Sequence, residues 1–373
     1  MTLKVTWPQA LAWRLGRHYL DPIQDVSVED VVDRLCGVQA QVASSAEMAV
    51  RVRQRGSSPG EVGAALASGD LIKTWAMRGT LHYLVPEKAG PFLSVLASGK
   101  TWHSPTWQRY FGMSPDQIER MLDVLGDVLA DEPLTREELV EAVTRRPGLD
   151  HMADSLRSGW GSVLKPLAWQ GRLVFGPSQG QRVTFMLPER ASKRWAGIPA
   201  LEDAAPAAID AYLAAYGPAT PMHFSAWISR GLIKKRQLLA WFAEMGDRLT
   251  TVEVDGQASY IRTADSDALG NAKPTKAVRL LSGFDQWVLG PGTDDPHVLA
   301  PGRRAAVSRT AGWIAPTVVR GGRVTGTWEL KGDTAVIGWF AEDGKPPAAA
   351  LAAEIGRYAA MVGRELRIEI ATV

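Results

Sequence analysis

The sequence of 373 residues contains a single cysteine, Cys36. One thiol excludes an internal disulfide, a cysteine-based zinc site and an iron–sulfur cluster, because each of these needs several cysteines. The six histidines lie far apart and form no metal-binding pair of the H-E-x-x-H kind. We therefore expect neither a metal nor an organic cofactor.

Long apolar runs and an excess of one charge are missing as well. No apolar run reaches the roughly 18–20 residues of a membrane helix, and the N-terminus lacks the apolar stretch of a secretion signal. These absences predict a cytoplasmic protein. The 42 basic and 40 acidic residues give a net charge of +2, which neither indicates nor excludes a nucleic-acid partner.

The common catalytic signatures are also absent. The sequence has no P-loop, no dinucleotide-binding glycine fingerprint, no G-x-S-x-G elbow and no Cys/His nucleophile pair. Any chemistry must therefore depend on a less familiar set of residues.

What the sequence does contain is a recurring order of short helices followed by two strands around a tight turn. The expected strand pairs are 71–75 with 80–85, 172–175 with 182–187, and 248–254 with 258–262. Helices followed by a β-hairpin are typical of winged-helix units.

From residue 277 onward the pattern favours strands, at 277–281, 287–289, 316–319, 323–330 and 335–340, before a helix over 347–361 and a short last strand. We predict a mostly helical α+β protein. Three tandem winged-helix units occupy residues 1–112, 113–200 and 201–265, and a β-rich C-terminal region occupies 266–373.

The segment between two predicted helices carries a pair of glutamines. Ser27 is expected to cap the first helix, which ends at Gly37, and Ser44 with Glu47 to cap a second helix that runs through residue 53. Side chains two residues apart share a side on an extended link but not on a helix. Gln39 and Gln41 are thus candidates for two neutral amides directed at one point. From the spacing alone, amides that satisfy backbone groups are the favoured interpretation.

Four segments resemble one family of enzymes. LCGVQAQVASSAEMAVRVR (35–53) resembles the Q-apolar-Q motif of AlkZ-type interstrand-crosslink DNA glycosylases, and TWAMRGTLHYLVP, YGPATPMHFSAWIS and FDQWVLG with RTAGWIAPTVV resemble further segments of that winged-helix family. The resemblance implies a monofunctional glycosylase in which Gln39 and Gln41 are catalytic. It also implies a partner: double-stranded DNA that carries alkylated or crosslinked purines. We expect the protein to act as a monomer.

Glutamines suit this chemistry. N7-alkylation makes the purine a cationic leaving group, and the transition state resembles an oxocarbenium ion. Amides do not titrate, but they can hold a water molecule beside the sugar carbon. The alternatives are a winged-helix transcriptional regulator, which would require dimerisation, and a non-catalytic binder of damaged DNA.

Basic residues of the first unit are candidates for DNA contacts. Arg51 and Arg53 lie at the end of the predicted helix that follows the glutamines and can hold phosphates, although charges at a helix end are often only solvated. Arg78 lies at the turn of the first predicted hairpin, next to His82, for which a half-buried structural position is the alternative.

A second candidate region begins at the glycine- and proline-rich stretch 290–297. It contains His297 and leads to Arg303 and Arg304, and a protruding loop there would probe the duplex near a lesion. The alternative is an ordinary surface loop. The 14 tryptophans sit mostly at helical apolar spacing, so we expect core packing for nearly all of them.

Overall fold

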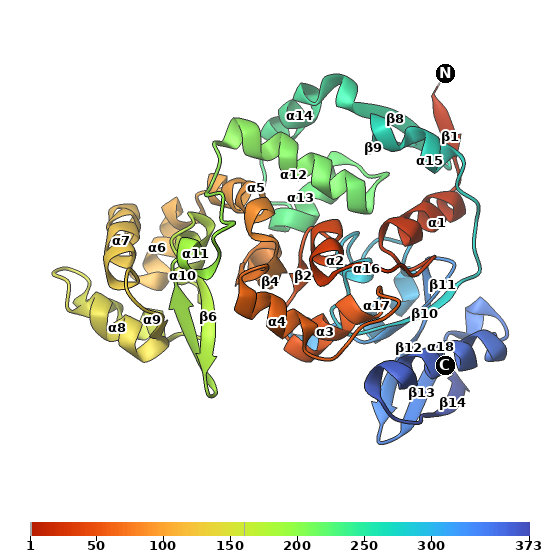
Figure 1. The fold of residues 1–373 in the computed structure, drawn as a ribbon. Coiled ribbons are helices and arrows are strands. Elements are labelled where there is room, and N and C mark those ends of the chain that lie inside the picture. The colour runs from red at the N-terminus through yellow and green to blue at the C-terminus, as the bar shows by residue number, and fades with distance from the viewer. Residues whose placement is uncertain (1, 160) are drawn as a thin grey trace. The chain divides into compact units, whose positions relative to one another are not determined.

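The computed structural model describes residues 2–159 and 161–373, and it is an α+β structure with more helix than strand (Figure 1). The chain forms two compact units. Unit 1 comprises Met1–Val62, Ile209–Trp227 and Leu238–Val373, and unit 2 comprises Gly63–Ala208 and Ile228–Gln237.

Unit 1 is assembled from three separate stretches of chain. Its elements are β1 (Leu3–Val5), α1 (Trp7–Arg17), α2 (Val28–Arg34), β2 (Val38–Gln39), α3 (Ala43–Arg51), β8 (Leu249–Val254), β9 (Gln257–Arg262), α15 (Ser266–Gly270), β10 (Val278–Leu281), α16 (Gln286–Leu289), α17 (Arg304–Val307), β11 (Thr317–Arg320), β12 (Arg323–Lys331), β13 (Thr334–Trp339), α18 (Ala348–Val362) and β14 (Arg367–Thr372).

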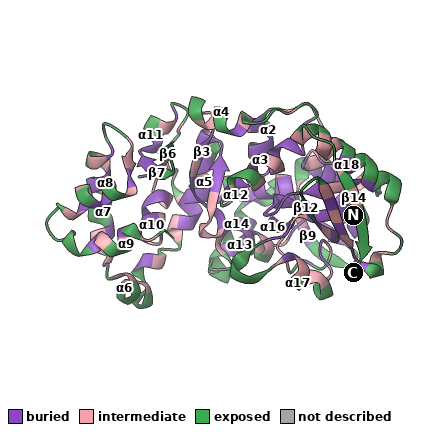
Figure 2. Cartoon of the chain, turned by 90° about the horizontal axis from the view of Figure 1, so that it is seen from below, coloured by how far each residue is buried: buried purple, intermediate pink, exposed green. Residues whose placement is uncertain are grey.

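Two sheets organise unit 1. In the first, β1 pairs in parallel with β8, which pairs antiparallel with β9. The second has the order β10-β11-β12-β13-β14, antiparallel except for the parallel pair β13–β14. Leu351 and Ile355 of α18 pack against this sheet in one buried cluster with Leu280 and Val318. The edge strand β14 is largely exposed (Figure 2).

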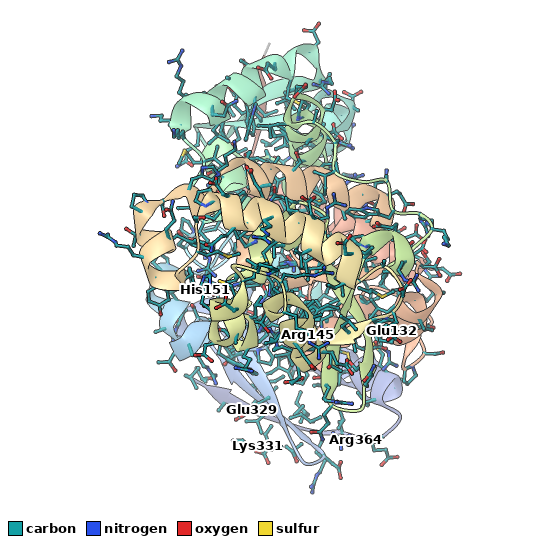
Figure 3. The ribbon with its side chains drawn as sticks, turned by 90° about the vertical axis from the view of Figure 1, so that its left-hand side faces the viewer. Glu132, Arg145, His151, Glu329, Lys331 and Arg364 are labelled. Atoms are coloured by element: carbon teal, nitrogen blue, oxygen red, sulfur yellow. The ribbon has the colours of Figure 1, made fainter. Side chains whose placement is uncertain are left out.

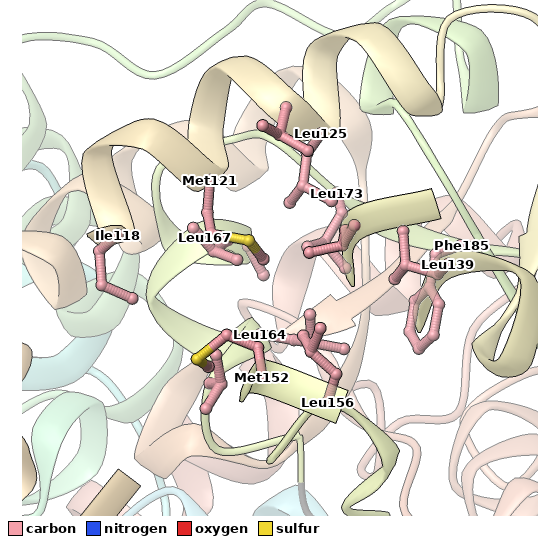
Figure 4. Close-up of a cluster of buried hydrophobic side chains, with 14 of the residues drawn as sticks. Ile118, Met121, Leu125, Leu139, Met152, Leu156, Leu164, Leu167, Leu173 and Phe185 are labelled. Carbon is pink, nitrogen blue, oxygen red and sulfur yellow. The ribbon is translucent and has the colours of Figure 1, made fainter. Parts of the chain in front are cut away.

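Unit 2 is built around one apolar cluster. Its elements are β3 (Ile72–Trp75), β4 (Leu81–Leu84), α5 (Pro86–Ser98), α6 (Pro105–Phe111), α7 (Pro115–Val128), β5 (Leu134–Thr135), α8 (Arg136–Thr144), α9 (Ala153–Arg157), α10 (Leu164–Trp169), β6 (Val174–Gln179), β7 (Arg182–Met186) and α11 (Pro188–Ala191). Met121 and Leu125 of α7, Leu139 of α8 and Leu167 of α10 meet in its interior (Figure 4).

Four helices contain residues of both units, because the chain passes from one unit to the other within them: α4 (Glu61–Ser68), α12 (Leu201–Tyr216), α13 (Pro221–Ser229) and α14 (Lys235–Glu244). Among the described residues, no helix combines the length and the apolar character needed to cross a membrane. The cytoplasmic location stays a prediction.

The three expected hairpins exist as β3–β4, β6–β7 and β8–β9. The strands β10 to β14 and helix α18 lie where the C-terminal pattern predicted them. The strand expected at 287–289 is wrong, because this segment is the helical turn α16. The cause of this helical turn is local: the Asp285 carboxylate accepts a hydrogen bond from the Trp287 backbone N–H at 2.8 Å and so caps the start of α16.

Candidate active site

The glutamine pair follows helix α2, which begins after Ser27 as predicted but ends at Arg34, before the expected stop at Gly37. Ser27 and Asp30 form a reciprocal capping box: the Ser27 Oγ accepts from the Asp30 N–H, and the Ser27 N–H donates to the Asp30 carboxylate. Cys36 and Gly37 have φ values of 56° and 108°, so the chain leaves the helix in the left-handed region. Burial raises the pKa of the Cys36 thiol, which makes it a poor nucleophile.

The two glutamines occupy different environments. Gln39 lies on the extended segment β2 and is only 6% exposed, whereas Gln41 lies at a bend and is exposed to solvent. The link between the helices is therefore extended at Gln39, as expected. One amide belongs to the interior and the other to the surface of unit 1. That both are directed at one reacting atom stays a prediction.

Helix α3 begins differently from the expectation. The predicted capping box of Ser44 and Glu47 is wrong, because α3 starts at Ala43 after Val42 and has no side-chain cap. Ser44 thus falls inside the first turn, and the Glu47 carboxylate accepts instead from the Gly60 N–H at 2.8 Å. The helix also ends at Arg51 rather than at residue 53.

Remote segments hold the start of the glutamine link. The Tyr216 hydroxyl, at the end of α12, donates to the Leu35 carbonyl at 2.8 Å. The backbone of Gly290 packs closely against the Tyr216 ring, since a Cβ at that glycine would lie 1.9 Å from it. The chain that precedes Gln39 is thereby fixed against two other stretches of unit 1.

The helix after the glutamines is fixed by a buried ion pair. Arg53 donates to both carboxylate oxygens of Asp285, at 2.8 and 2.7 Å, and both side chains are at most 1% exposed. The Ser282 hydroxyl also donates to the carbonyl of Ser45, in the first turn of α3, at 2.9 Å. The glutamines therefore lie between two anchored helix ends.

The structure places Arg51 and Arg53 in the interior. Arg51 is 5% exposed and donates to the Met361 carbonyl at 2.6 Å and to the Ser57 hydroxyl at 3.2 Å. Both arginines thus serve contacts within unit 1, and a role in DNA binding is not supported by their positions.

The first hairpin turn contains Arg78, which is half-buried and has a φ of 59°. Its neighbour His82 is fully buried, deeper than the half-buried position expected. Its Nδ1 lies 3.0 Å from the Thr80 carbonyl and so carries the proton. Burial, and next the nearby charge of Arg78, lower the pKa of His82 to about 3.

The second candidate region separates into three environments. His297 stacks on Trp7, with ring centroids 3.8 Å apart. Arg303 binds both carboxylate oxygens of Glu342, at 2.8 and 2.6 Å, and lies over the ring of Phe340. Arg304 is exposed and makes one long contact, 3.3 Å, to the Thr293 hydroxyl. Of the three predicted DNA contacts, Arg304 is the one whose side chain faces solvent.

One exposed aromatic residue was not anticipated. Trp313 is 46% exposed and packs edge-on against Phe284, although core packing was expected for nearly all tryptophans. Its position directly after Gly312 (φ 74°) in a short exposed loop is the sequence signal that distinguishes it. No group of three or more His, Cys, Asp or Glu side chains that could hold a metal occurs in residues 2–159 and 161–373.

Comparison with known proteins identifies the family. A family model described as DNA glycosylase AlkZ-like matches residues 32–361. The interstrand DNA cross-link repair glycosylase of Streptomyces sahachiroi is 45% identical over 362 residues, which cover 97% of this chain and 98% of that protein. The chain belongs to the AlkZ-like DNA glycosylase family. The solved structure of Streptomyces sahachiroi DNA glycosylase AlkZ superposes with a TM-score of 0.97, at 44% identity, over 99% of this chain and 100% of that one.

Membership confirms the resemblance inferred from the sequence. The chain is a DNA glycosylase, an enzyme that hydrolyses N-glycosyl bonds, and its α+β fold is that of AlkZ. The alternative of a winged-helix transcriptional regulator is disfavoured, because the similarity to glycosylases extends over nearly the whole chain.

Proposed function

We propose that this glycosylase removes N7-alkylated purines from double-stranded DNA and unhooks interstrand crosslinks, with Gln39 and Gln41 holding the water that attacks the sugar. The observation that carries the proposal is the position of the pair, one amide buried and one exposed, on a short link anchored at both ends. The similar protein from Streptomyces sahachiroi is named for cross-link repair, which supports the substrate.

The chemistry needs positioning more than proton transfer. A cationic purine leaves readily, so the protein must mainly place a water molecule beside the sugar carbon and stabilise the developing charge. An amide offers a carbonyl acceptor and two N–H donors and keeps one charge state at every working pH. A link fixed through Leu35 and Arg53 keeps such amides in place during the reaction.

The finer architecture is part of the proposal. Each of the hairpins β3–β4, β6–β7 and β8–β9 follows a set of helices, which supports winged-helix units at 1–112, 113–200 and 201–265 before a β-rich region at 266–373. Among the predicted DNA contacts, Arg304 is favoured because its side chain is exposed, whereas Arg51, Arg53 and Arg303 are bonded to protein groups. Arg78 and His297 stay predictions. We propose a monomer, which light scattering after gel filtration tests.

The test is base excision from a duplex that carries N7-methylguanine, followed by alkaline cleavage of abasic sites. The double variant Gln39→Ala/Gln41→Ala should lower the single-turnover rate by on the order of 100-fold, the size expected when a positioned amide is removed. The control variant Gln257→Ala removes an exposed glutamine of unit 1 and should excise like the wild type.

The outcomes separate the alternatives. Equal rates for the double variant and the wild type, with equal melting temperatures, would contradict the catalytic role of the pair. If the wild type excises only from a crosslinked duplex, the substrate is narrower than simple adducts. If it binds both duplexes without excision, the chain is a non-catalytic binder of damaged DNA.

A further inference from the structure

A cavity of about 280 Å³ lies in unit 1, between the segment after α3 and the C-terminal helix α18. Gln54, Arg55 and Ser57 line it from one side, and Arg357 and Met361 from the other. We call it the α3–α18 pocket. It lies apart from the glutamines, at the opposite end of α3.

The walls of the pocket are tied together. Arg51, at the end of α3, donates to the Ser57 hydroxyl on one wall and to the Met361 carbonyl on the other. The Arg55 N–H donates to the Gln24 carbonyl at 2.8 Å, which fixes the backbone of the exposed wall. Hydrogen bonds within the protein therefore hold both walls of the pocket.

Two arginines, Arg357 and Arg55, bring positive charge to the pocket, and of the two only Arg55 has no carboxylate partner among the described residues. Arg357 donates to the Glu354 carboxylate and, at 3.2 Å, to the Val52 carbonyl. The same carboxylate lies 3.8 Å from the guanidinium of Arg279, which also has the Asp21 carboxylate at 3.9 Å, so two carboxylates balance the charges of these two arginines. Arg55 is exposed, and among the described residues its guanidinium makes a single hydrogen bond, 3.4 Å long, to the Ile23 carbonyl. Most of its five N–H donors are therefore available.

Gln54 adds a hydrogen-bond acceptor to the wall of the α3–α18 pocket. Gln54 is 6% exposed, and its amide nitrogen donates to the Val26 carbonyl at 3.0 Å. Its Oε1 is buried and has no hydrogen-bond partner among the described residues. A buried carbonyl oxygen needs a donor, such as a bound water. The guanidinium donors of Arg55 at the same wall match an oxyanion rather than an apolar ligand, and a water between that anion and the Gln54 oxygen would satisfy both.

We propose that the α3–α18 pocket binds a phosphate of the DNA backbone, with Arg55 as its main donor. The inference rests on the proposed function and adds a phosphate contact to it. Helix α3 has nine residues and is about 13.5 Å long, which equals about four base-pair steps of 3.4 Å. The pocket and the glutamines thus lie at opposite ends of a helix of about this length.

The assignment also explains the arginine run 51–55. Its two buried members build the pocket and the glutamine link, and the exposed member meets the ligand. Its partner Arg357 is 302 positions away from Arg55 in the sequence, so the run alone does not reveal the site.

The test measures affinity for an undamaged duplex by fluorescence anisotropy over a series of KCl concentrations. Arg55→Ala should weaken binding several-fold on every sequence and lower the slope of log K against log salt by about 0.9, the value for one phosphate contact. Arg364→Ala removes another partly exposed arginine of unit 1, one that pairs with Asp333 (Figure 3). This control should leave the slope unchanged, and Arg55→Lys should restore it.

An unchanged slope in Arg55→Ala would overturn the proposal. Calorimetric titration with inorganic phosphate distinguishes a free anion: binding that Arg55→Ala abolishes, together with an unchanged DNA slope, would assign the pocket to a small phosphate and also overturn it. Excision is scored separately. A wild type that fails to excise but shows the Arg55-dependent slope would remove the proposed function and leave this site standing.

Discussion

The two units differ in what they bury. Unit 1 buries charged side chains, among them Arg14, Arg53, Asp285 and Glu354. In the described part of unit 2, the buried polar residues are hydroxyl-bearing side chains and His82, around the apolar cluster of Figure 4. Both interiors contain apolar clusters, and the interior of unit 1 adds buried charged pairs to them.

The difference follows from how each unit is assembled. Unit 2 consists mainly of one continuous stretch, whose helices can pack as they form. Unit 1 must join three stretches, and its buried bonds connect them: Arg53 binds Asp285, and Tyr216 binds the Leu35 carbonyl. A buried ion pair contributes little net stability compared with apolar packing, but each buried charge requires one specific partner of opposite charge. The polar interior thus specifies where the glutamine link lies.

The largest effect is expected from Asp285→Ala. Removal of this carboxylate leaves the Arg53 guanidinium buried and unpaired, which should destabilise unit 1 by roughly 3–5 kcal/mol. Urea unfolding measures the change. The double variant Arg53→Met/Asp285→Leu removes both charges and should recover most of the loss. A cost below about 1 kcal/mol for the single variant would show that water reaches this pair.

These pairs mark the limit of what the sequence predicts. The capping box of Ser27, the three hairpins and the helix α18 follow from local patterns, because neighbouring residues determine them. The pairing of Arg53 with a residue 232 positions away leaves no local signal. The strand wrongly expected at 287–289 shows the same limit at short range, since the apolar residues of one helical turn resemble a buried strand.

The candidate site was predictable to a similar degree. Gln39 and Gln41 stand out through the family resemblance, whereas their spacing alone favoured a structural role. The sequence could not show that one is buried and the other exposed, because β2 is only two residues long. Nor could the sequence show which arginines of the run 51–55 are buried, since Arg53 is buried by its contact with Asp285 and Arg51 by its contact with the C-terminal helix.

A smaller effect concerns pH and the one histidine buried in unit 2. The pKa of His82 is lowered to about 3 from an ordinary 6.5, because burial disfavours the charged ring. The folded state therefore binds fewer protons than the unfolded state below pH 6.5. The stability contributed by the neutral ring is complete above pH 6.5 and is lost as the pH falls towards 3, by about 1.4 kcal/mol per pH unit.

Urea unfolding at pH 7 and pH 5 measures this contribution. His82→Gln should lose about 2 kcal/mol less than the wild type over that interval, which spans about 1.5 units below pH 6.5. The exposed His151 (Figure 3) provides the control variant His151→Gln, which should follow the wild type. Equal pH dependence of His82→Gln and the wild type would mean that the ring is hydrated in the folded protein.

The smallest expected effect is the loss of a helix cap, and it tests whether the two units also differ at their surfaces. Ser27 caps α2 in unit 1 and Ser114 caps α7 in unit 2, each through a reciprocal pair with the residue three positions later, Asp30 or Gln117. Ser27→Ala and Ser114→Ala should each cost about 1 kcal/mol, because a cap satisfies backbone N–H groups locally. Urea unfolding at low and high salt measures both, and only the cap that uses the Asp30 carboxylate should weaken with salt. If Ser27→Ala costs several kcal/mol while Ser114→Ala costs about 1, the end of α2 is coupled to the buried polar bonds beyond it.

The buried polar pairs of unit 1 would then stabilise its exposed helix ends as well as the glutamine link. The two units would in that case differ in the stability of their surface caps and not only in their interiors.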